Sequence, residues 1–220
     1  MSSKSRRVPF LLSLYQKYLD DQDSASFLRR TSKHYTQGTL ERLAVHASVE
    51  VRRGAVLALG FLADYQANHT LGQALNDDDR TVRMLAEDGI RKVWNRAGGH
   101  QERQHLAAII RLNTARRFDD AILRATELID RAPWFAEAWN QRAVARFALE
   151  QYAEAIRDCH QALEINPYHF AAAAGMGQAY LRLGNRVSAL ECLRRALRLN
   201  PDLEGVRVQV ARLTKLMEGK

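Results

Sequence analysis

Apolar residues recur along this chain at the three- and four-residue steps of α-helices. Near its end the apolar steps are 3, 4, 3 and 4, through Leu203, Val206, Val210, Leu213 and Met217. Near its start an i, i+4 stripe runs through Phe10, Leu11, Leu14, Tyr15, Tyr18 and Leu19. Such spacing gathers apolar side chains on one face of a helix. The pattern predicts an almost wholly helical protein, with a helical cap over 1–39 and an amphipathic capping helix over 202–220.

The N-terminal cap is expected to hold a second helix. Phe27, Leu28 and Tyr35 supply its apolar positions. Gly38 is predicted to end this helix, and Thr39 is predicted to cap the next one, since these residue types are common at helix ends.

The middle and end of the chain contain a repeat of 34 residues. Pro133, Pro167 and Pro201 are spaced by 34 without drift, and small residues keep the same register at Ala121, Ala155 and Ala189. A fixed period of this length indicates stacked units, each too small to bury its own apolar face. We therefore predict helical hairpins that end near each proline.

Two of these units resemble tetratricopeptide (TPR) repeats. The phrases "AEAWNQRAVARFALEQYAEAIRDCHQALEINP" and "FAAAAGMGQAYLRLGNRVSALECLRRALRLNP" carry the signature positions Trp139, Ala143, Ala155, Ala162, Gly177, Tyr180, Ala189, Ala196 and Pro201. The preceding segment departs at His105 and Leu112 and matches mainly in its second half. The resemblance implies three TPR-like repeats over 101–201, in an α-solenoid of stacked hairpins.

An upstream period of 31 residues relates "VRRGAVLALGFL", from Val51, to "VRMLAEDGIRKVW", from Val82. These strings resemble the second helix of short HEAT-like repeats, which implies such repeats over about 40–97. In that family an Asp in the turn and an Arg after the Val bond between stacked repeats, and Asp77 and Arg83 hold those places. His46 replaces the acid in the earlier copy, so the ladder between repeats is expected to be incomplete.

The acidic run Asp77, Asp78 and Asp79 raises the question of a metal site. Its place in the turn of a repeat favours helix capping, because an acid there accepts from free N–H groups and complements the helix dipole. A calcium loop needs ligands at alternating positions and a closing Glu, which a regular helix would prevent here. Ser48 is expected to cap the equivalent helix of the first copy.

The sequence offers little catalytic chemistry. Gly175 and Gly177 form a G-x-G without a preceding strand, so we interpret them as sites of close helix packing rather than a phosphate loop. The two cysteines, Cys159 and Cys192, fall within helical patterns and are interpreted as buried, inert thiols. We expect no enzymatic activity, no cofactor, no metal and no small-molecule substrate.

Charge is concentrated at the two ends of the chain. The formal net charge is +8, and residues 170–220 carry nine basic and four acidic groups. No apolar stretch approaches the roughly 20 residues that span a bilayer. We expect a cytoplasmic protein without a membrane span.

Function is therefore expected to lie in surfaces. The TPR resemblance implies a concave groove lined by the first helix of each hairpin, where Glu137 also falls, and its predicted partner-binding residues are Asn140, Val144, Phe147, Gln178, Leu181 and Arg182. The clamp that TPR proteins use for chaperone C-termini is missing, since Leu106, Ile110, Gln141, Ala171 and Gly175 occupy its positions. We predict a protein-interaction scaffold or adaptor that binds an apolar or helical peptide.

Two alternatives stay open at this point. The groove side chains could instead pack beneath the N-terminal region or the C-terminal helix. The basic ends could also make the chain a solenoid that binds the nucleic-acid backbone, because arginines crowd the last helices.

Overall fold

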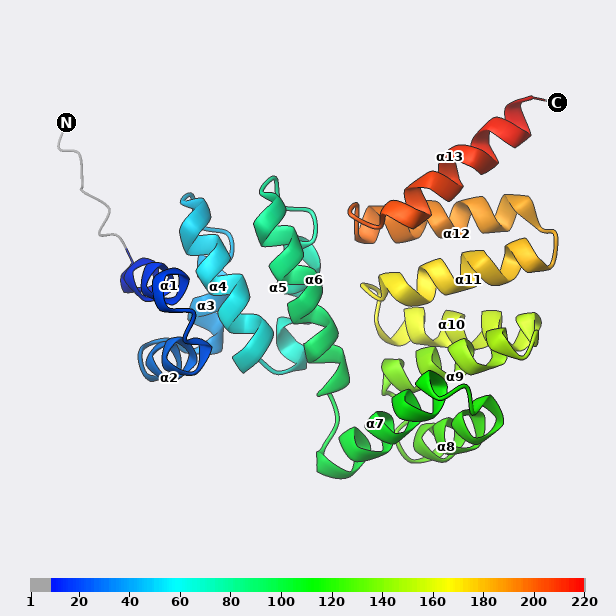
Figure 1. Ribbon diagram of the computed structural model, residues 1–220, viewed down its shortest axis with the longest axis horizontal. Helices are drawn as coiled ribbons and strands as arrows, with labels where there is room; N and C mark the ends of the chain where they lie inside the picture. Colours follow the sequence, from blue (N-terminus) through cyan, green and yellow to red (C-terminus); the bar gives the residue numbers. More distant parts are fainter. Residues whose placement is uncertain (1–8, 220) are drawn as a thin grey trace. The chain divides into compact units, whose positions relative to one another are not determined.

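The protein is all-α, as predicted. A computed structural model describes residues 9–219, in which helices hold about 80% of the chain and strands are absent (Figure 1). Contacts between residues divide the chain into two units, the first ending at Val93 and the second beginning at Trp94.

The first unit is built around one buried helix. Its helices are α1 (Phe10–Asp21), α2 (Ser24–His34), α3 (Gln37–Leu43), α4 (Val49–Leu62), α5 (Asn68–Ala74) and most of α6 (Arg80–Asn95), with a 3-10 turn at Tyr65–Ala67. The last two residues of α6, from Trp94, belong to the second unit. Helices α1, α2, α3 and α5 all contact α4. A β-carbon on Gly60 of α4 would lie 2.8 Å from the α-carbon of Gly89 in α6. These two glycines let the second helices of the two repeats approach closely.

The boundary between α2 and α3 differs from the prediction. Helix α2 ends at His34, and Thr36, not Thr39, caps α3 by accepting from the backbone N–H of Thr39. Gly38 therefore lies in the first turn of α3 and does not end α2. The cap that the Thr36 hydroxyl provides stabilises the start of α3 by more than the low helix propensity of Gly38 destabilises it.

The second unit is a succession of antiparallel helices. They are α7 (His100–Thr114), α8 (Phe118–Arg131), α9 (Ala136–Ala148), α10 (Tyr152–Ile165), α11 (Phe170–Arg182), α12 (Arg186–Leu199) and α13 (Glu204–Glu218). Each helix contacts the next, and α9 also contacts α7 and α11. Figure 1 shows α9 to α13 following one another along the stack. This neighbour-to-neighbour packing is the pattern expected of a solenoid.

Two apolar clusters form most of the core of this unit, and Trp139 packs against both. Its indole N–H donates to the carbonyl of Pro133 at 2.9 Å, so the residue that carries the TPR signature also ties α9 to the preceding turn. Gly177 confirms the expected close packing, because a β-carbon there would lie 2.7 Å from Leu193. Gly175 is looser, with its nearest neighbour, Cys159, at 3.5 Å.

Helix α13 packs on α12 through the predicted apolar stripe. Leu213 is buried, and Val206 and Val210 pack against the same cluster as Leu190 and Leu193. The apolar stripe is no longer buried at its C-terminal end, where Met217 is exposed.

Candidate partner-binding face

The six predicted partner-binding residues lie on α9 and α11. We call them the α9–α11 face: Asn140, Val144, Phe147, Gln178, Leu181 and Arg182. Phe147 lies in the last turn of α9 and is half-buried, with its ring edge-on to that of Tyr152 at 5.3 Å between centroids. The exposed Arg182 reaches over from α11, and its guanidinium carbon lies 5.9 Å from the centre of the Phe147 ring. Val144, one turn before Phe147, is 45% exposed. The three residues thus bring an apolar surface and a cation together.

Asn140 lies deeper than an open binding position would require. It is buried, and its amide donates to Oε1 of Glu137 at 3.1 Å. Gln141 donates to the same oxygen at 2.8 Å. The amide of Asn140 therefore already has a partner within its own helix.

Glu137 is not a groove-lining side chain, contrary to the expectation, because it forms a buried pair with His169. Nδ1 of His169 accepts from the backbone N–H of Ala172 and caps α11, so its Nε2 carries the proton and donates to Oε2 of Glu137 at 3.0 Å. Burial by itself would raise the pKa of Glu137, but the bonds from His169 and the two amides outweigh it and lower the pKa. The ring of Trp94 stacks on His169 and helps to exclude water from the pair.

Gln178 and Leu181 contact the C-terminal helix. The side-chain amides of Gln178 and Gln209 of α13 bond to each other. Leu181 packs against the cluster that contains Leu213. The α11 half of the face is therefore partly covered by α13, whereas Val144, Phe147 and Arg182 remain accessible.

A buried ionic network that the sequence analysis did not identify lies behind this face. Arg142 of α9 forms two bonds with Asp158 of α10, at 2.9 and 3.0 Å, and Arg146 adds a third at 2.8 Å. Arg142 also donates to Thr126 of α8. The network fixes the orientation of α9 and so the direction in which Val144 and Phe147 point.

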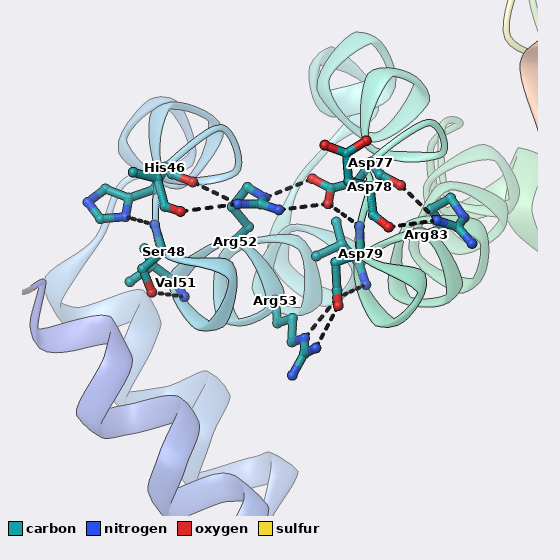
Figure 2. A network of polar contacts seen from close by, with 11 residues as sticks. His46, Ser48, Val51, Arg52, Arg53, Asp77, Asp78, Asp79 and Arg83 are labelled. Carbon is teal, nitrogen blue, oxygen red and sulfur yellow. Dashed lines mark hydrogen bonds and ion pairs between the residues drawn. The ribbon is translucent and has the colours of Figure 1, made fainter.

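The acidic run of the first unit caps a helix and bridges the two repeats (Figure 2). Asp79 accepts from the backbone N–H of Val82 at 3.0 Å, which confirms the predicted cap of α6. Asp77 receives both arms of the Arg52 guanidinium at 2.8 Å, and Asp79 receives those of Arg53. The bond to Arg53 is the main reason that the pKa of Asp79 falls to about 2.

The two arginines that follow a valine play equivalent roles. Arg83 donates to the carbonyls of Asp77 and Asp78, and Arg52 donates to those of His46 and Ala47. Asp77 thus pairs with the arginine of the previous repeat, as the HEAT-like resemblance implied. At the earlier position His46 provides its backbone carbonyl and a ring nitrogen that accepts from Ser48 N–H, so no side-chain carboxylate continues the ladder there. Ser48 caps α4 as predicted.

Both cysteines are buried and free, as predicted. Burial raises the pKa of Cys159 to about 12 and also raises that of Cys192, so both stay protonated near neutral pH.

Between residues 9 and 219 no three His, Cys, Asp or Glu side chains gather as a metal site would require. No helix in that span has the length and apolar character needed to cross a membrane. The cytoplasmic location stays a prediction.

Comparison with protein families agrees with this architecture. The HEAT-repeat family model matches residues 36–126, and tetratricopeptide-repeat models match residues 136–169 and 170–203. The chain therefore carries HEAT repeats followed by TPR repeats, as the sequence predicted. The first of the three predicted TPR-like units, which begins near residue 101, lies before both TPR matches. Its assignment, like the other domain boundaries, stays a prediction.

Several proteins have sequences similar to this chain. A TPR repeat-containing protein of Rhizobium etli is 28% identical over 143 residues, which span 65% of this chain and 69% of that protein. The Hsp70-Hsp90 organizing protein of Triticum aestivum is 28% identical over 98 residues, 44% of this chain but 17% of that protein. Tetratricopeptide repeat protein 12 of Homo sapiens is 33% identical over 40% of this chain and 12% of that protein.

Solved TPR structures share the fold. The first TPR of Spaghetti (RPAP3) bound to an HSP90 peptide has a TM-score of 0.53 at 21% identity, covering 55% of this chain and 96% of that one. The TPR2B domain of yeast Sti1 in complex with pHsp70 has a TM-score of 0.50 at 23% identity, covering 54% of this chain and 99% of that one. These likenesses establish a TPR fold and leave the ligand of this chain to its own residues.

Proposed function

We propose that the protein is a non-catalytic adaptor whose α9–α11 face binds an apolar or helical segment of a partner protein. The observation that carries the proposal is the pairing of Arg182 with the Phe147 ring beside the exposed Val144. A partner helix could bury Val144 and Phe147 and place an acidic or carbonyl group on Arg182. Aromatic and arginine side chains are the residue types that most often dominate binding energy in interfaces.

The relatives support a protein partner but not a particular one. Two of the similar structures hold a TPR domain bound to an HSP90 peptide and a TPR domain in complex with pHsp70. In this chain the positions of the chaperone-binding clamp hold Leu106, Ile110, Gln141, Ala171 and Gly175. None of these side chains can pair with a C-terminal carboxylate as a lysine or arginine would. We therefore do not extend the chaperone ligand to this protein.

Nucleic-acid binding is the second candidate, and one observation favours it. Of the described residues, the cations on the last two helices make no ion pair with an acidic side chain: Arg186, Arg194, Arg195, Arg198, Arg207, Arg212 and Lys215. Unneutralised cations attract phosphate backbones, and such binding weakens steeply as salt rises. An apolar interface should change little over the same range.

Affinity purification from the native cell, followed by titration at two salt concentrations, tests the proposal. We expect Phe147→Ala and Arg182→Glu to weaken partner capture while the melting temperature stays nearly unchanged. Trp139→Ala is the contrasting variant, because Trp139 packs against both core clusters and its loss should destabilise the fold. If Phe147→Ala destabilises the protein as severely as Trp139→Ala, Phe147 is a core residue and the proposed face is wrong. Salt-sensitive binding of generic DNA or RNA, abolished by Arg194→Glu with Arg198→Glu, would favour the second candidate.

A further inference from the structure

A separate cavity lies on the first hairpin of the second unit, away from the α9–α11 face. It has a volume of about 540 Å³ and is lined by Ala108, Arg111, Leu112, Ala115, Arg117, Asp120, Leu123 and Arg124. Every lining residue belongs to α7, α8 or the turn between them, and none belongs to α9. We call it the α7–α8 groove.

The groove is formed by one stripe from each helix. Ala108, Arg111 and Leu112 of α7 and Ala115, which caps its C-terminus, follow the i, i+3, i+4, i+7 spacing of a single helix face. Arg117, which precedes α8, and the α8 residues Asp120, Leu123 and Arg124 likewise span two turns. At 1.5 Å per residue the groove is roughly 10 Å long, which accommodates two turns of a peptide helix or about three extended residues.

The groove is lined by both apolar side chains and arginines. Leu123 is 60% exposed although it is a large aliphatic side chain, and alanines and Leu112 lie beside it. Three arginines face a single lining carboxylate, Asp120. This imbalance favours an occupant that carries negative charge next to an apolar side chain.

The acids that pair with these arginines hold them only weakly. Arg117 bonds to Asp120, and Arg124 bonds to Glu127 at 3.1 Å, but both arginine side chains are more than 60% exposed. Exposed pairs of this kind contribute little to stability, so an incoming carboxylate can compete for the guanidinium groups. Arg111 makes no ion pair within residues 9–219 and is available without any rearrangement.

We propose that the α7–α8 groove is a second docking site, and that its occupant is an acidic peptide segment with one bulky apolar side chain. The apolar side chain lies against Leu112 and Leu123, and flanking carboxylates pair with Arg111 and Arg124. The site does not depend on the α9–α11 face. An adaptor with both sites would hold two segments, from one partner or from two, and would gain avidity from their linkage.

Fluorescence anisotropy with the full chain tests this site. The probe is a fluorescein-labelled peptide of sequence Glu-Asp-Ser-Leu-Glu-Asp, which has one bulky apolar side chain, with a second peptide in which Ser replaces Leu. We expect saturable binding of the first peptide and at least about tenfold weaker binding of the second, because the serine peptide buries little apolar surface. Arg111→Glu with Arg124→Glu should weaken binding by about tenfold or more, and Leu123→Ser should do the same.

Matched controls lie on α12. Arg186→Glu repeats the charge reversal at an exposed arginine, and Val187→Ser repeats the apolar loss at a side chain that is 57% exposed. Neither should change the affinity, and neither should Phe147→Ala, so a failure here is distinct from a failure of the proposed function. Absence of saturable binding up to about 1 mM peptide, which is near the weak limit of specific recognition, would overturn the proposal. Equal losses in the α12 controls, or binding of short duplex DNA in place of the peptide, would also overturn it.

Discussion

Asp77→Ala should destabilise the first unit far more than the loss of an ordinary surface carboxylate. Asp77 accepts two bonds from Arg52, both at 2.8 Å, and one from the backbone N–H of Asp79 at 2.8 Å. The side chains of Arg52 and Asp77 are 18% and 12% exposed. The pair is therefore intermediate between exposed pairs, which contribute about 0.2–1 kcal/mol, and fully buried ones, whose disruption costs about 3–5 kcal/mol.

The expected loss follows from these contacts. We assign about 1–2 kcal/mol to the bidentate ion pair between Arg52 and Asp77 and about 1 kcal/mol to the hydrogen bond from the backbone N–H of Asp79. The free energy of unfolding should therefore fall by about 2–3 kcal/mol. Urea unfolding monitored by far-UV circular dichroism measures this change. A double-mutant cycle with Arg52→Ala should give a coupling energy of about 1–2 kcal/mol.

Asp88→Ala is the matched control, because Asp88 pairs with Lys92 within α6 and its side chain is 61% exposed. Its removal should cost at most about 0.5 kcal/mol. If Asp77→Ala costs no more than Asp88→Ala, or if the cycle shows no coupling, Asp77 does not join the two repeats energetically.

Three further changes test other parts of the account. The pKa of Asp79 is lowered from 3.8 to about 2, so the unfolded chain binds the proton more readily, and the stability that Asp79 contributes should be present above about pH 4 and lost as the pH falls toward 2. Asp79→Asn should therefore lower the unfolding free energy by about 1–2 kcal/mol at pH 7. A difference between the variant and the original protein that does not shrink by about pH 2 would contradict this. Gly177→Ala should lower the melting temperature, since its β-carbon would meet Leu193 at 2.7 Å; an unchanged melting temperature would show that α11 and α12 can separate freely. Ending the chain at Pro201 should increase dye binding to exposed apolar surface, because Leu190 and Leu193 lose Leu213; equal solubility and stability would show that α13 is not a cap.

The repeat architecture could be predicted because each unit obeys the same packing rules. The 34-residue proline spacing and the small residues in register gave the hairpins of the second unit, and Gly177 was correctly placed at a close helix contact. The 31-residue spacing showed the second repeat, and the resemblance to HEAT-like repeats implied that Asp77 bonds between repeats. These features depend on local sequence and on nearest neighbours, which a period records directly.

The side-chain partners within the site could not be predicted in the same way. Glu137 and His169 are 32 residues apart, and their pairing depends on how α9 and α11 stack. One signal was present, because His169 follows Pro167 at the start of a helix, where a cap is expected. The contact between Gln178 and Gln209 depends on the angle at which α13 packs, and no period includes α13. The sequence therefore predicted the helices that carry these residues, but not that α13 contacts Gln178 and Leu181.

Site-specific photo-crosslinking shows whether a protein binds the α9–α11 face in the cell. A photoreactive amino acid in place of Val144, which is 45% exposed, samples whatever binds the α9–α11 face in the native cell. The same replacement at Val208 of α13, which is 63% exposed, serves as the control. We expect a discrete crosslinked protein at position 144 that is lost with Arg182→Glu and is absent at position 208. No protein adduct at position 144, or the same adducts at both positions, would contradict it.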